Sequence, residues 1–229
     1  TLGLLPTGSG KSLCYQLCAI LQPAVSFVVS PIKALMYDQK ADLDLAYLSR
    51  TNHITSDDDG EDKEKILNEF GAGKYLFIFI SPERFQIKSF RKNFISVNKK
   101  FNLAYAVIDE IHCLSEWGHS FRTSYLTLAD TIGNYCNNFT YIGLTATAST
   151  NVIKDIQIEL NIEQDNIKTP SDYTREEIEF VAIDDKNAKD EALVDLLYEQ
   201  KESSDIFRVN EGNTKCGLIF TSLVNNSPN

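Results

Sequence analysis

The chain has 229 residues, of which 43% are hydrophobic and 24% are charged, a composition typical of a globular protein with one full core and part of a second. It contains no run of eighteen apolar residues and no opening signal segment, so we expect a soluble, intracellular protein. The formal net charge of −10 argues against extensive wrapping of nucleic acid, but it leaves room for a local phosphate track, because salt confines the field of each patch to roughly 8 Å.

Short apolar runs separated by longer helical segments dominate the chain up to about residue 150. The runs are apolar on both faces, as expected for a parallel sheet that is covered by helices on both sides. The predicted strands are Val25–Ser30, Tyr75–Ser81, Leu103–Asp109 and Tyr141–Thr145. The predicted helices are Ser12–Leu21, Pro31–Leu48 and Lys63–Phe70, the last preceded by an acidic turn at Asp57–Asp62. The predicted fold class is therefore α/β, with a mainly parallel central sheet between helical layers.

After Thr150 the chain becomes acidic and polar. A strand is predicted at Ile178–Ile183, followed by a helix at roughly Asp190–Glu199 and a final strand at Cys216–Thr221. We therefore expect one domain over residues 1–180, and a linker with the beginning of a second domain over residues 181–229. Because the chain starts without Met inside a strand-like run and stops just after another, we expect it to be a fragment of a longer protein.

One stretch carries charge of a single sign. Between Arg84 and Lys100 there are six basic residues and no acidic one. A solvated helix face is the interpretation that the charge pattern alone favours, and a local track for phosphates is the alternative.

A glycine-rich segment, Leu4–Ser12, follows a strand-like start and opens a helix. Its glycines allow backbone N–H groups to turn inward on an anion, and the helix N-terminus adds positive charge at the same point. Lys11 is expected to reach the β- and γ-phosphates of ATP, and Ser12 to hold Mg²⁺ through its hydroxyl. The strict phosphate-loop pattern has glycine where this chain has Leu5, so a glycine-rich turn before an ordinary helix is the alternative. The predicted nucleotide-binding residues are Pro6, Thr7, Gly8, Ser9, Gly10, Lys11 and Ser12.

The predicted strand Leu103–Asp109 runs directly into a second carboxylate, Glu110. Burial of such a pair is costly unless a positive charge lies nearby, and Mg²⁺ on nucleotide phosphates would supply that charge. We expect Asp109 to be a magnesium ligand and Glu110 to be the base that orients or deprotonates the attacking water. A solvated acidic turn is the alternative. It is less favoured because the phosphate loop begins from another strand of the same predicted sheet, and such sheets bind ligands at the carboxyl ends of their strands.

The chain resembles the RecQ helicases of superfamily 2 in segments that occur in the family's order. Motif I is resembled by Pro6–Leu17, motif Ia by Val29–Gln39 and motif Ib by Ile80–Phe85. Motif II with the aromatic-rich loop is resembled by Asp109–Arg122, motif III by Gly143–Ala148, and the start of motif IV by Gly217–Thr221. The resemblance implies a RecA-like P-loop NTPase domain, a three-layer αβα sandwich, in residues 1–180 and the start of a second RecA-like domain in residues 181–229. It also implies an ATP-dependent DNA helicase that uses ATP and Mg²⁺ and moves 3′-to-5′ on single-stranded DNA or at single/double-strand junctions. Such a protein would be cytoplasmic in a bacterium or nuclear in a eukaryote.

The sequence departs from the family pattern in several places. Family members usually have Ala at the position of Ile111, and they tend to have Asp and Pro at the positions of Ser120 and Thr123. The upstream glutamine motif that reads adenine and the later motifs with the arginine finger are missing. We therefore expect this fragment to bind nucleotide poorly and to hydrolyse it slowly, if at all.

The resemblance also assigns nucleic-acid and coupling roles. Trp117, Phe121 and Arg122 would stack on unpaired bases or contact phosphate; an ordinary core stripe is the alternative, because the two aromatic residues are four apart. His112 is expected to hydrogen-bond toward the phosphates or motif III, and the spacing of the nearby histidines and cysteine forms no recognised zinc site. The remaining predicted contacts are Ser30, Pro31, Ser81 and Arg84 at DNA-facing strand ends, and Thr145 and Thr147 as couplers to the interdomain cleft.

Three functional hypotheses remain open at this point. The first is a DNA helicase of RecQ type, and the second is an RNA helicase or duplex translocase of the same superfamily. The third is a nucleotide-gated nucleic-acid-binding module without productive hydrolysis, for which the net acidity and the departures at Leu5 and Ile111 leave room.

Overall fold

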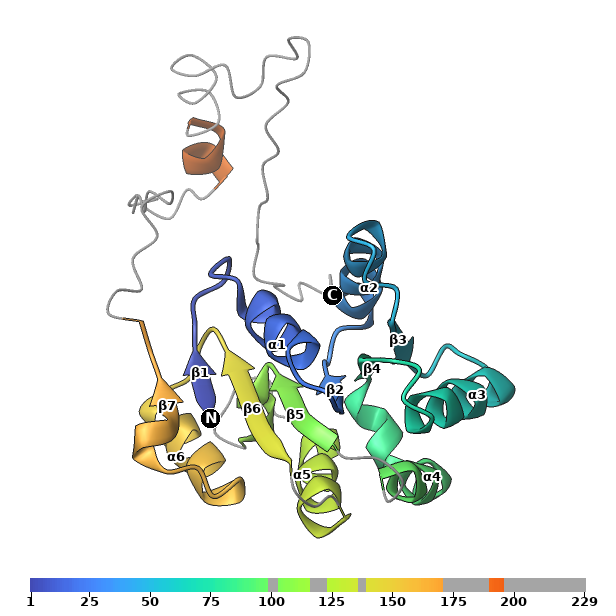
Figure 1. Cartoon of the computed structure of the whole chain (residues 1–229). Helices are drawn as coiled ribbons and strands as arrows, with labels where there is room; N and C mark the ends of the chain where they lie inside the picture. The colour runs from blue at the N-terminus through green and yellow to red at the C-terminus, as the bar shows by residue number, and fades with distance from the viewer. Residues whose placement is uncertain (99–102, 116–122, 136–138, 171–189, 196–229) are drawn as a thin grey trace, which may run out of the picture. The chain divides into compact units, whose positions relative to one another are not determined.

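The computed structural model describes residues 1–98, 103–115, 123–135, 139–170 and 190–195 (Figure 1). The chain divides into two units, Thr1–Thr174 and Arg175–Asn229. Within the second unit only residues 190–195 are described, and they are helical. The strands predicted at Ile178–Ile183 and Cys216–Thr221 lie outside the described residues, so the predicted domain boundary between residues 180 and 181 stays a prediction.

Within the described residues, seven strands form one sheet in the order β3-β4-β2-β5-β6-β1-β7. Every neighbouring pair is parallel. The strands are β1 (Leu2–Leu4), β2 (Val25–Val29), β3 (Thr51–Ile54), β4 (Phe77–Ile80), β5 (Leu103–Asp109), β6 (Thr140–Thr145) and β7 (Ile167–Lys168). The strands β2 and β4 are buried along their whole length, as central strands of a parallel sheet must be.

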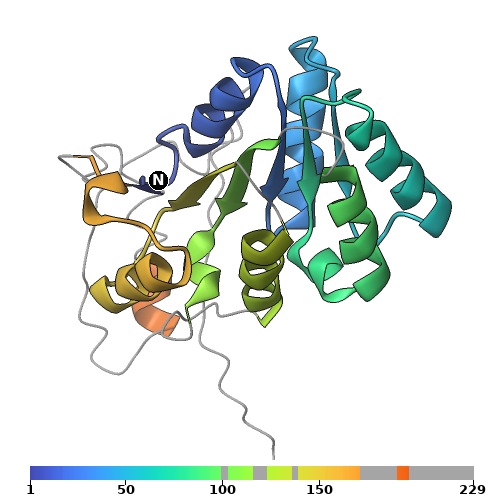
Figure 2. The same ribbon diagram turned by 60° about the horizontal axis from the view of Figure 1, so that its bottom comes forward.

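Helices cover both faces of this sheet (Figures 1 and 2). One face packs against α1 (Lys11–Ile20) and α2 (Lys33–Leu45) through a core that includes Tyr15 and Met36. The opposite face packs against α3 (Gly60–Gly71), α4 (Lys88–Asn98), α5 (Thr123–Tyr135) and α6 (Thr150–Glu159). Three short 3₁₀ segments connect these elements: η1 (Pro82–Gln86), η2 (Ile111–Leu114) and η3 (Gln164–Asn166). The predicted α/β fold class with three αβα layers is confirmed.

The alternation of side chains along β5 determines which residues face which layer. Ala106 and Ile108 belong to the core under α4, α5 and α6, whereas Val107 belongs to the core under α1 and α2. Because side chains alternate with a period of two, Asp109 at the end of the strand lies on the same side as Val107. The carboxylate predicted to bind magnesium therefore lies on the α1 side of the sheet.

The four strands and three helices predicted before Thr150 are all present, with ends displaced by a few residues. The helix α2 ends at Leu45 and not at Leu48, and α3 begins at Gly60 and not at Lys63. Asp59 is its N-cap and accepts a hydrogen bond from the N–H of Asp62 at 2.8 Å, so part of the predicted acidic turn is the first turn of the helix. Acidic residues are favoured there by the positive end of the helix dipole.

The basic stretch after Arg84 forms η1 and α4. Phe94 of α4 packs against Phe27 and Phe85, with ring centroids 5.1 Å and 5.3 Å apart. Lys88 and Lys92 are exposed, as a solvated helix face requires. No helix among the described residues is long and apolar enough to span a membrane.

Candidate active site

The carboxyl edge of the sheet brings the two predicted motifs together. β6 lies between β1 and β5, with Leu4 paired to Thr145 and Leu144 paired to Asp109. The chain leaves β1 through Leu5, whose N–H donates to the Thr145 carbonyl at 2.9 Å. The phosphate loop, Thr145 and Asp109 are therefore at one edge, where parallel α/β sheets bind ligands.

The phosphate loop is exposed and has the backbone that its glycines allow. Gly8 and Gly10 both have φ of 84°, in the left-handed region that favours glycine. Gly10 is the N-cap of α1 and provides no side-chain cap, so the first amides of this helix point toward the loop without a side-chain acceptor. Such a helix start favours an anion. The Lys11 ammonium donates to the Leu5 carbonyl at 3.4 Å, which holds it over the same loop.

Leu5, the departure from the strict motif, is accommodated by the fold. Its side chain is partly buried against the core under α1 and α2. Positive φ within the loop occurs at Gly8 and Gly10 and not at Leu5. A leucine at this position therefore requires no strained backbone, and it adds packing between the loop and the sheet.

Asp109 is a buried carboxylate, with 4% of its surface exposed. Burial, followed by the nearby charge of Glu110, raises the pKa of Asp109 to about 6, while Lys11 acts in the opposite direction. Its Oδ1 accepts the N–H of Glu110 at 3.0 Å. A carboxylate held this way is under-compensated, and its oxygens, with a hydroxyl from Ser12 on α1, would be ligands of the kind that Mg²⁺ prefers. The residues therefore fit the implied ion.

Tyrosine side chains hold the site from both faces of the sheet. The Tyr15 hydroxyl on α1 donates to Oε1 of Gln39 on α2, and Tyr15 is 1% exposed. Burial and the charge of Asp109 both raise the pKa of Tyr15. From the opposite face, the Tyr125 hydroxyl donates to the Asp109 carbonyl at 3.1 Å. These contacts join α1 to α2 on one face of the sheet and α5 to the end of β5 on the other.

A chain of polar contacts leads from the acidic pair to the loop after β6. His112 Nδ1 lies 3.2 Å from Glu110 Oε2 and 2.8 Å from Thr145 Oγ1, so the contact with motif III expected from the sequence is present. The Thr145 hydroxyl donates in turn to the Thr147 carbonyl at 3.1 Å. The Cys113 sulfur and the Glu110 carboxylate raise the pKa of His112 to about 9, and His112 lowers the pKa of Glu110. The pair is therefore an ion pair at neutral pH.

Glu110 has an unusual backbone. Its φ of 49° and ψ of 46° lie in the left-handed region, which non-glycine residues rarely adopt. This conformation ends β5 abruptly and starts η2, so that the carboxylate turns toward His112. Strain of this kind persists only where the surrounding structure imposes it, and it is found most often at functional sites.

Ile111, the departure within the acidic motif, faces the core and not the site. It is fully buried and packs on Gly143 of β6, where an added Cβ would lie 2.4 Å from Ile111 Cδ1. The substitution relative to the family pattern is therefore a packing change. It leaves the arrangement of Asp109, Glu110 and His112 intact.

The predicted nucleic-acid contacts are only partly accessible. Ser30 and Ser81 follow the neighbouring strands β2 and β4, but each is 1% exposed, and neither hydroxyl has a hydrogen-bond partner among the described residues. Pro31 and Arg84 are half-buried beside them. A phosphate would reach the two hydroxyls only after the covering side chains move.

Some predicted residues lie outside the described part of the chain. These are Trp117, Phe121 and Arg122, whose assigned roles stay predictions. Sequence reasoning also passed over Lys33 and Asp57, which form an ion pair at the same edge of the sheet. The available signals were a lysine within the segment that resembles motif Ia and the run of acids that starts at Asp57.

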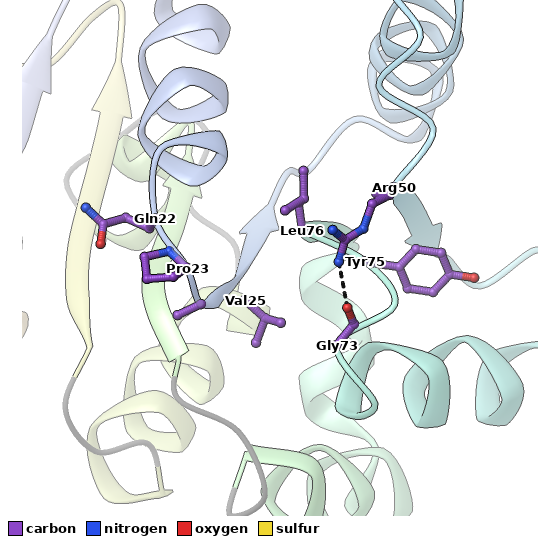
Figure 3. Close-up of a pocket in the computed structure, with 8 residues that line it drawn as sticks. Gln22, Pro23, Val25, Arg50, Gly73, Tyr75 and Leu76 are labelled. Carbon is purple, nitrogen blue, oxygen red and sulfur yellow. Dashed lines mark hydrogen bonds between the residues drawn. The ribbon is translucent and has the colours of Figure 1, made fainter.

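A separate cavity of about 300 Å³ lies at the amino edge of the sheet (Figure 3). It is lined by residues at the starts of β2, β3 and β4, among them Val25, Arg50 and Leu76. The Arg50 guanidinium donates to the carbonyls of Gly73 at 2.8 Å and Lys74 at 3.1 Å. This cavity is at the opposite end of the strands from the phosphate loop, so it is not the nucleotide site.

The fold and this site define the class of RecA-like P-loop nucleoside triphosphatases. Within that class the chain belongs to the DEAD/DEAH box helicase family, the model of which matches residues 1–156.

The resemblance to RecQ helicases is also confirmed. The RecQ-like DNA helicase blm-1 of Caenorhabditis elegans is 36% identical over 185 residues, and the ATP-dependent DNA helicase RecQ of Bacillus subtilis is 31% identical over 203 residues. These alignments cover 79% and 89% of this chain, but 18% and 33% of the two relatives. The chain therefore spans a third or less of their length.

Solved structures with the same fold include two helicases. The Hef helicase domain of Pyrococcus furiosus superposes with a TM-score of 0.55 at 18% identity, over 74% of this chain and 34% of that one. The DUF1998 helicase MrfA bound to DNA and AMPPNP has a TM-score of 0.56 at 19% identity, over 75% of this chain and 24% of that one. At these identities the likeness shows the fold.

Proposed function

We propose that this chain is the ATP-binding part of a RecQ-type DNA helicase. It would couple ATP hydrolysis to 3′-to-5′ translocation on single-stranded DNA and to duplex unwinding. The observation that carries the proposal is the shared edge at which the phosphate loop with Lys11 faces the buried carboxylate of Asp109. The names of the relatives in worm and Bacillus, both DNA helicases, support DNA as the substrate.

In this proposal each residue of the site has a distinct chemical task. The loop from Pro6 to Gly10 offers backbone N–H groups to the triphosphate, and Lys11 neutralises charge on its outer phosphates. Ser12 and Asp109 would hold Mg²⁺, which offsets the charge that develops on the phosphates. Glu110 is ionised at neutral pH because His112 lowers its pKa, so it is able to orient the attacking water or accept its proton.

The contact chain of His112, Thr145 and Thr147 would couple the nucleotide site to the nucleic acid. A change in the charge around Glu110 alters the hydrogen bond that His112 makes with Thr145, and Thr147 is exposed at the end of that chain. Trp117 lies five residues after His112 in the sequence. In the proposal, base stacking by Trp117 and Phe121, with a phosphate or cation–π contact from Arg122, therefore acts on the same short segment.

DNA would cross the carboxyl edge beside the nucleotide, at the ends of β2 and β4. Ser30, Pro31, Ser81 and Arg84 are the proposed contacts there, and they would recognise the backbone without reading sequence. Because the two serine hydroxyls are buried, their contacts would form after an initial encounter with exposed cations of the same rim.

The test is the ATPase rate of the full-length protein, with Glu110→Gln as the catalytic variant and Glu159→Gln, an exposed carboxylate on α6, as the matched control. We expect single-stranded DNA to stimulate the wild type and the control equally. Glu110→Gln should lower the stimulated rate by about 10²- to 10⁴-fold, because it removes a general base.

The other outcomes of this assay identify the competing functions. Stronger stimulation by single-stranded RNA than by DNA would favour an RNA helicase, and stimulation by duplex alone would favour a duplex translocase. Equal inactivity of wild type and Glu110→Gln with every strand type would contradict an enzyme and favour a nucleotide-gated binding module.

A further inference from the structure

Lys33 and Asp57 form an ion pair outside the nucleotide site. Lys33 is the first residue of α2 and comes three residues after Ser30, so it lies at the carboxyl edge of the sheet. Its Nζ is 2.6 Å from Asp57 Oδ1, and the two side chains are 37% and 58% exposed. The pair is thus accessible to solvent on the rim where the proposed function requires a nucleic-acid backbone.

The loop after β3 holds Asp57 in this position through several hydrogen bonds. The N–H of Thr55 donates to Asp58 Oδ2 at 2.6 Å, and the N–H of Asp57 donates to Thr55 Oγ1 at 3.2 Å. Tyr37 of α2 donates to Asp57 Oδ2 at 3.3 Å and also lies 3.1 Å from Thr55 Oγ1. Both oxygens of the Asp57 carboxylate are therefore engaged by groups of α2.

The start of α2 is a favourable place for an anion. Its N-cap, Ile32, provides no side-chain cap, and the first bond within the helix is from the N–H of Met36 to the Ile32 carbonyl. The positive end of the helix dipole and the Lys33 ammonium thus act at one point. The interaction raises the pKa of Lys33 and lowers that of Asp57, chiefly through their hydrogen bond, so both are charged at neutral pH.

We propose that Asp57 occupies, in the DNA-free protein, the place of a nucleic-acid backbone phosphate on Lys33. Lys33 is then a further phosphate contact, and Asp57 competes with the strand for it. Because both side chains are exposed, the pair is weak enough for a phosphate to displace the carboxylate. Asp57 would therefore lower the affinity for DNA without removing the contact. The inference rests on the proposed function, since it requires a strand at this rim.

The experiment measures the affinity of the nucleotide-free, full-length protein for a fluorescein-labelled oligo-dT strand by anisotropy at low salt. We expect Asp57→Asn to bind about three- to tenfold more tightly than the wild type. Lys33→Gln should bind more weakly and should reduce the slope of log affinity against log salt by about 0.7, the value for one single-strand phosphate contact. The double variant should bind like Lys33→Gln, because without the lysine there is no phosphate contact for which Asp57 competes.

A matched control lies on the same helix. Lys40 and Asp44 form another ion pair, with 2.5 Å between Nζ and Oδ2 and side chains that are 19% and 46% exposed. Asp44 is ~16 Å along the helix axis from Lys33. Asp44→Asn makes the same change in net charge away from the rim, so it should alter oligo-dT affinity by less than about twofold. Tyr37→Phe releases one bond to Asp57 and should give a smaller gain than Asp57→Asn.

Two results would overturn the inference. The first is an Asp57→Asn variant that binds no more tightly than Asp44→Asn, and the second is a double variant that keeps the full gain of Asp57→Asn. If the wild type binds oligo-dT and shows DNA-stimulated ATPase activity, either result contradicts this inference alone. A wild type with neither property removes the proposed function and the inference together.

Discussion

Asp109 carries the largest electrostatic cost in the candidate site. It is buried at a strand end, its nearest like charge is the adjacent Glu110, and Lys11 compensates it only in part. A side chain selected for stability alone would be neutral at this position. The cost therefore reflects the task that we propose for Asp109, which is to offer an oxygen to a cation.

The electrostatic cost of burying the Asp109 charge depends on pH in the metal-free protein. The folded-state pKa of Asp109, about 6, lies above its ordinary value of 3.8, so between these values the folded chain binds more protons than the unfolded chain. Stability from this group is thus present below about pH 4 and is lost as the pH rises through 6. Asp109→Asn should raise the free energy of unfolding at pH 7 by up to about 3 kcal/mol, measured by urea unfolding in EDTA.

The difference between Asp109→Asn and wild type should shrink toward zero near pH 3.5, where both side chains are neutral. Asp165→Asn, at an exposed position, is the control and should show no such trend. An Asp109→Asn variant that is less stable than the wild type at pH 7 would show that the folded protein stabilises the charge.

At the scale of elements, the contact between η2 and β6 joins the acidic motif to motif III. Ile111 fills the space over Gly143, and the His112 side chain next to it reaches Thr145 at the end of the same strand. Packing and hydrogen bonding thus hold one short 3₁₀ segment against one strand. The position of His112 depends on how well Ile111 fits.

This contact predicts strong coupling between two substitutions. Gly143→Ala places a methyl group against Ile111 and should destabilise the chain by about 1–3 kcal/mol. Ile111→Ala alone removes buried contacts and should cost about 2–5 kcal/mol. In the double variant the new methyl enters the space left by isoleucine, so the total cost should fall below the sum by at least about 1 kcal/mol, as measured by a double-mutant cycle in urea. Strict additivity would show that the two residues do not share this space.

At the scale of the whole molecule, the net charge of −10 restricts how the proposed DNA strand would be bound. Lys33 and Arg84 are basic residues near the proposed rim, and Lys33 is already paired with Asp57. Acidic residues elsewhere repel a strand that would extend beyond this rim. Binding by this chain should therefore be local and should involve few phosphates.

The salt dependence of oligo-dT affinity, measured on the isolated 229-residue chain, tests whether binding involves few phosphates. Each single-strand phosphate contact contributes about −0.7 to the slope of log affinity against log salt, so contacts by two to four groups predict a slope of roughly −1 to −3. The measurement is oligo-dT anisotropy between about 50 and 200 mM salt. A slope steeper than about −5 would mean that the chain engages a far longer phosphate track than its charge distribution allows.

Local patterns were sufficient for much of the fold. The strands β2, β4, β5 and β6 were predicted because a strand buried on both faces is apolar throughout. The strand β3 was missed because it lies at the edge of the sheet, where its middle residues Asn52 and His53 are half-buried and polar side chains are tolerated. The helix α6 was also missed, since its chain segment follows a change to polar composition at Thr150.

The sequence by itself determined the phosphate loop and the acidic pair, because glycine conformations and adjacent carboxylates at a strand end are local properties. Only the tertiary structure decided that the partner of His112 in motif III is Thr145, 33 residues away, and that Lys33 meets Asp57, 24 residues away. The physical reason is the parallel sheet: its strands are joined by helical crossovers, so the carboxyl ends that share an edge are separated in the chain by a whole helix.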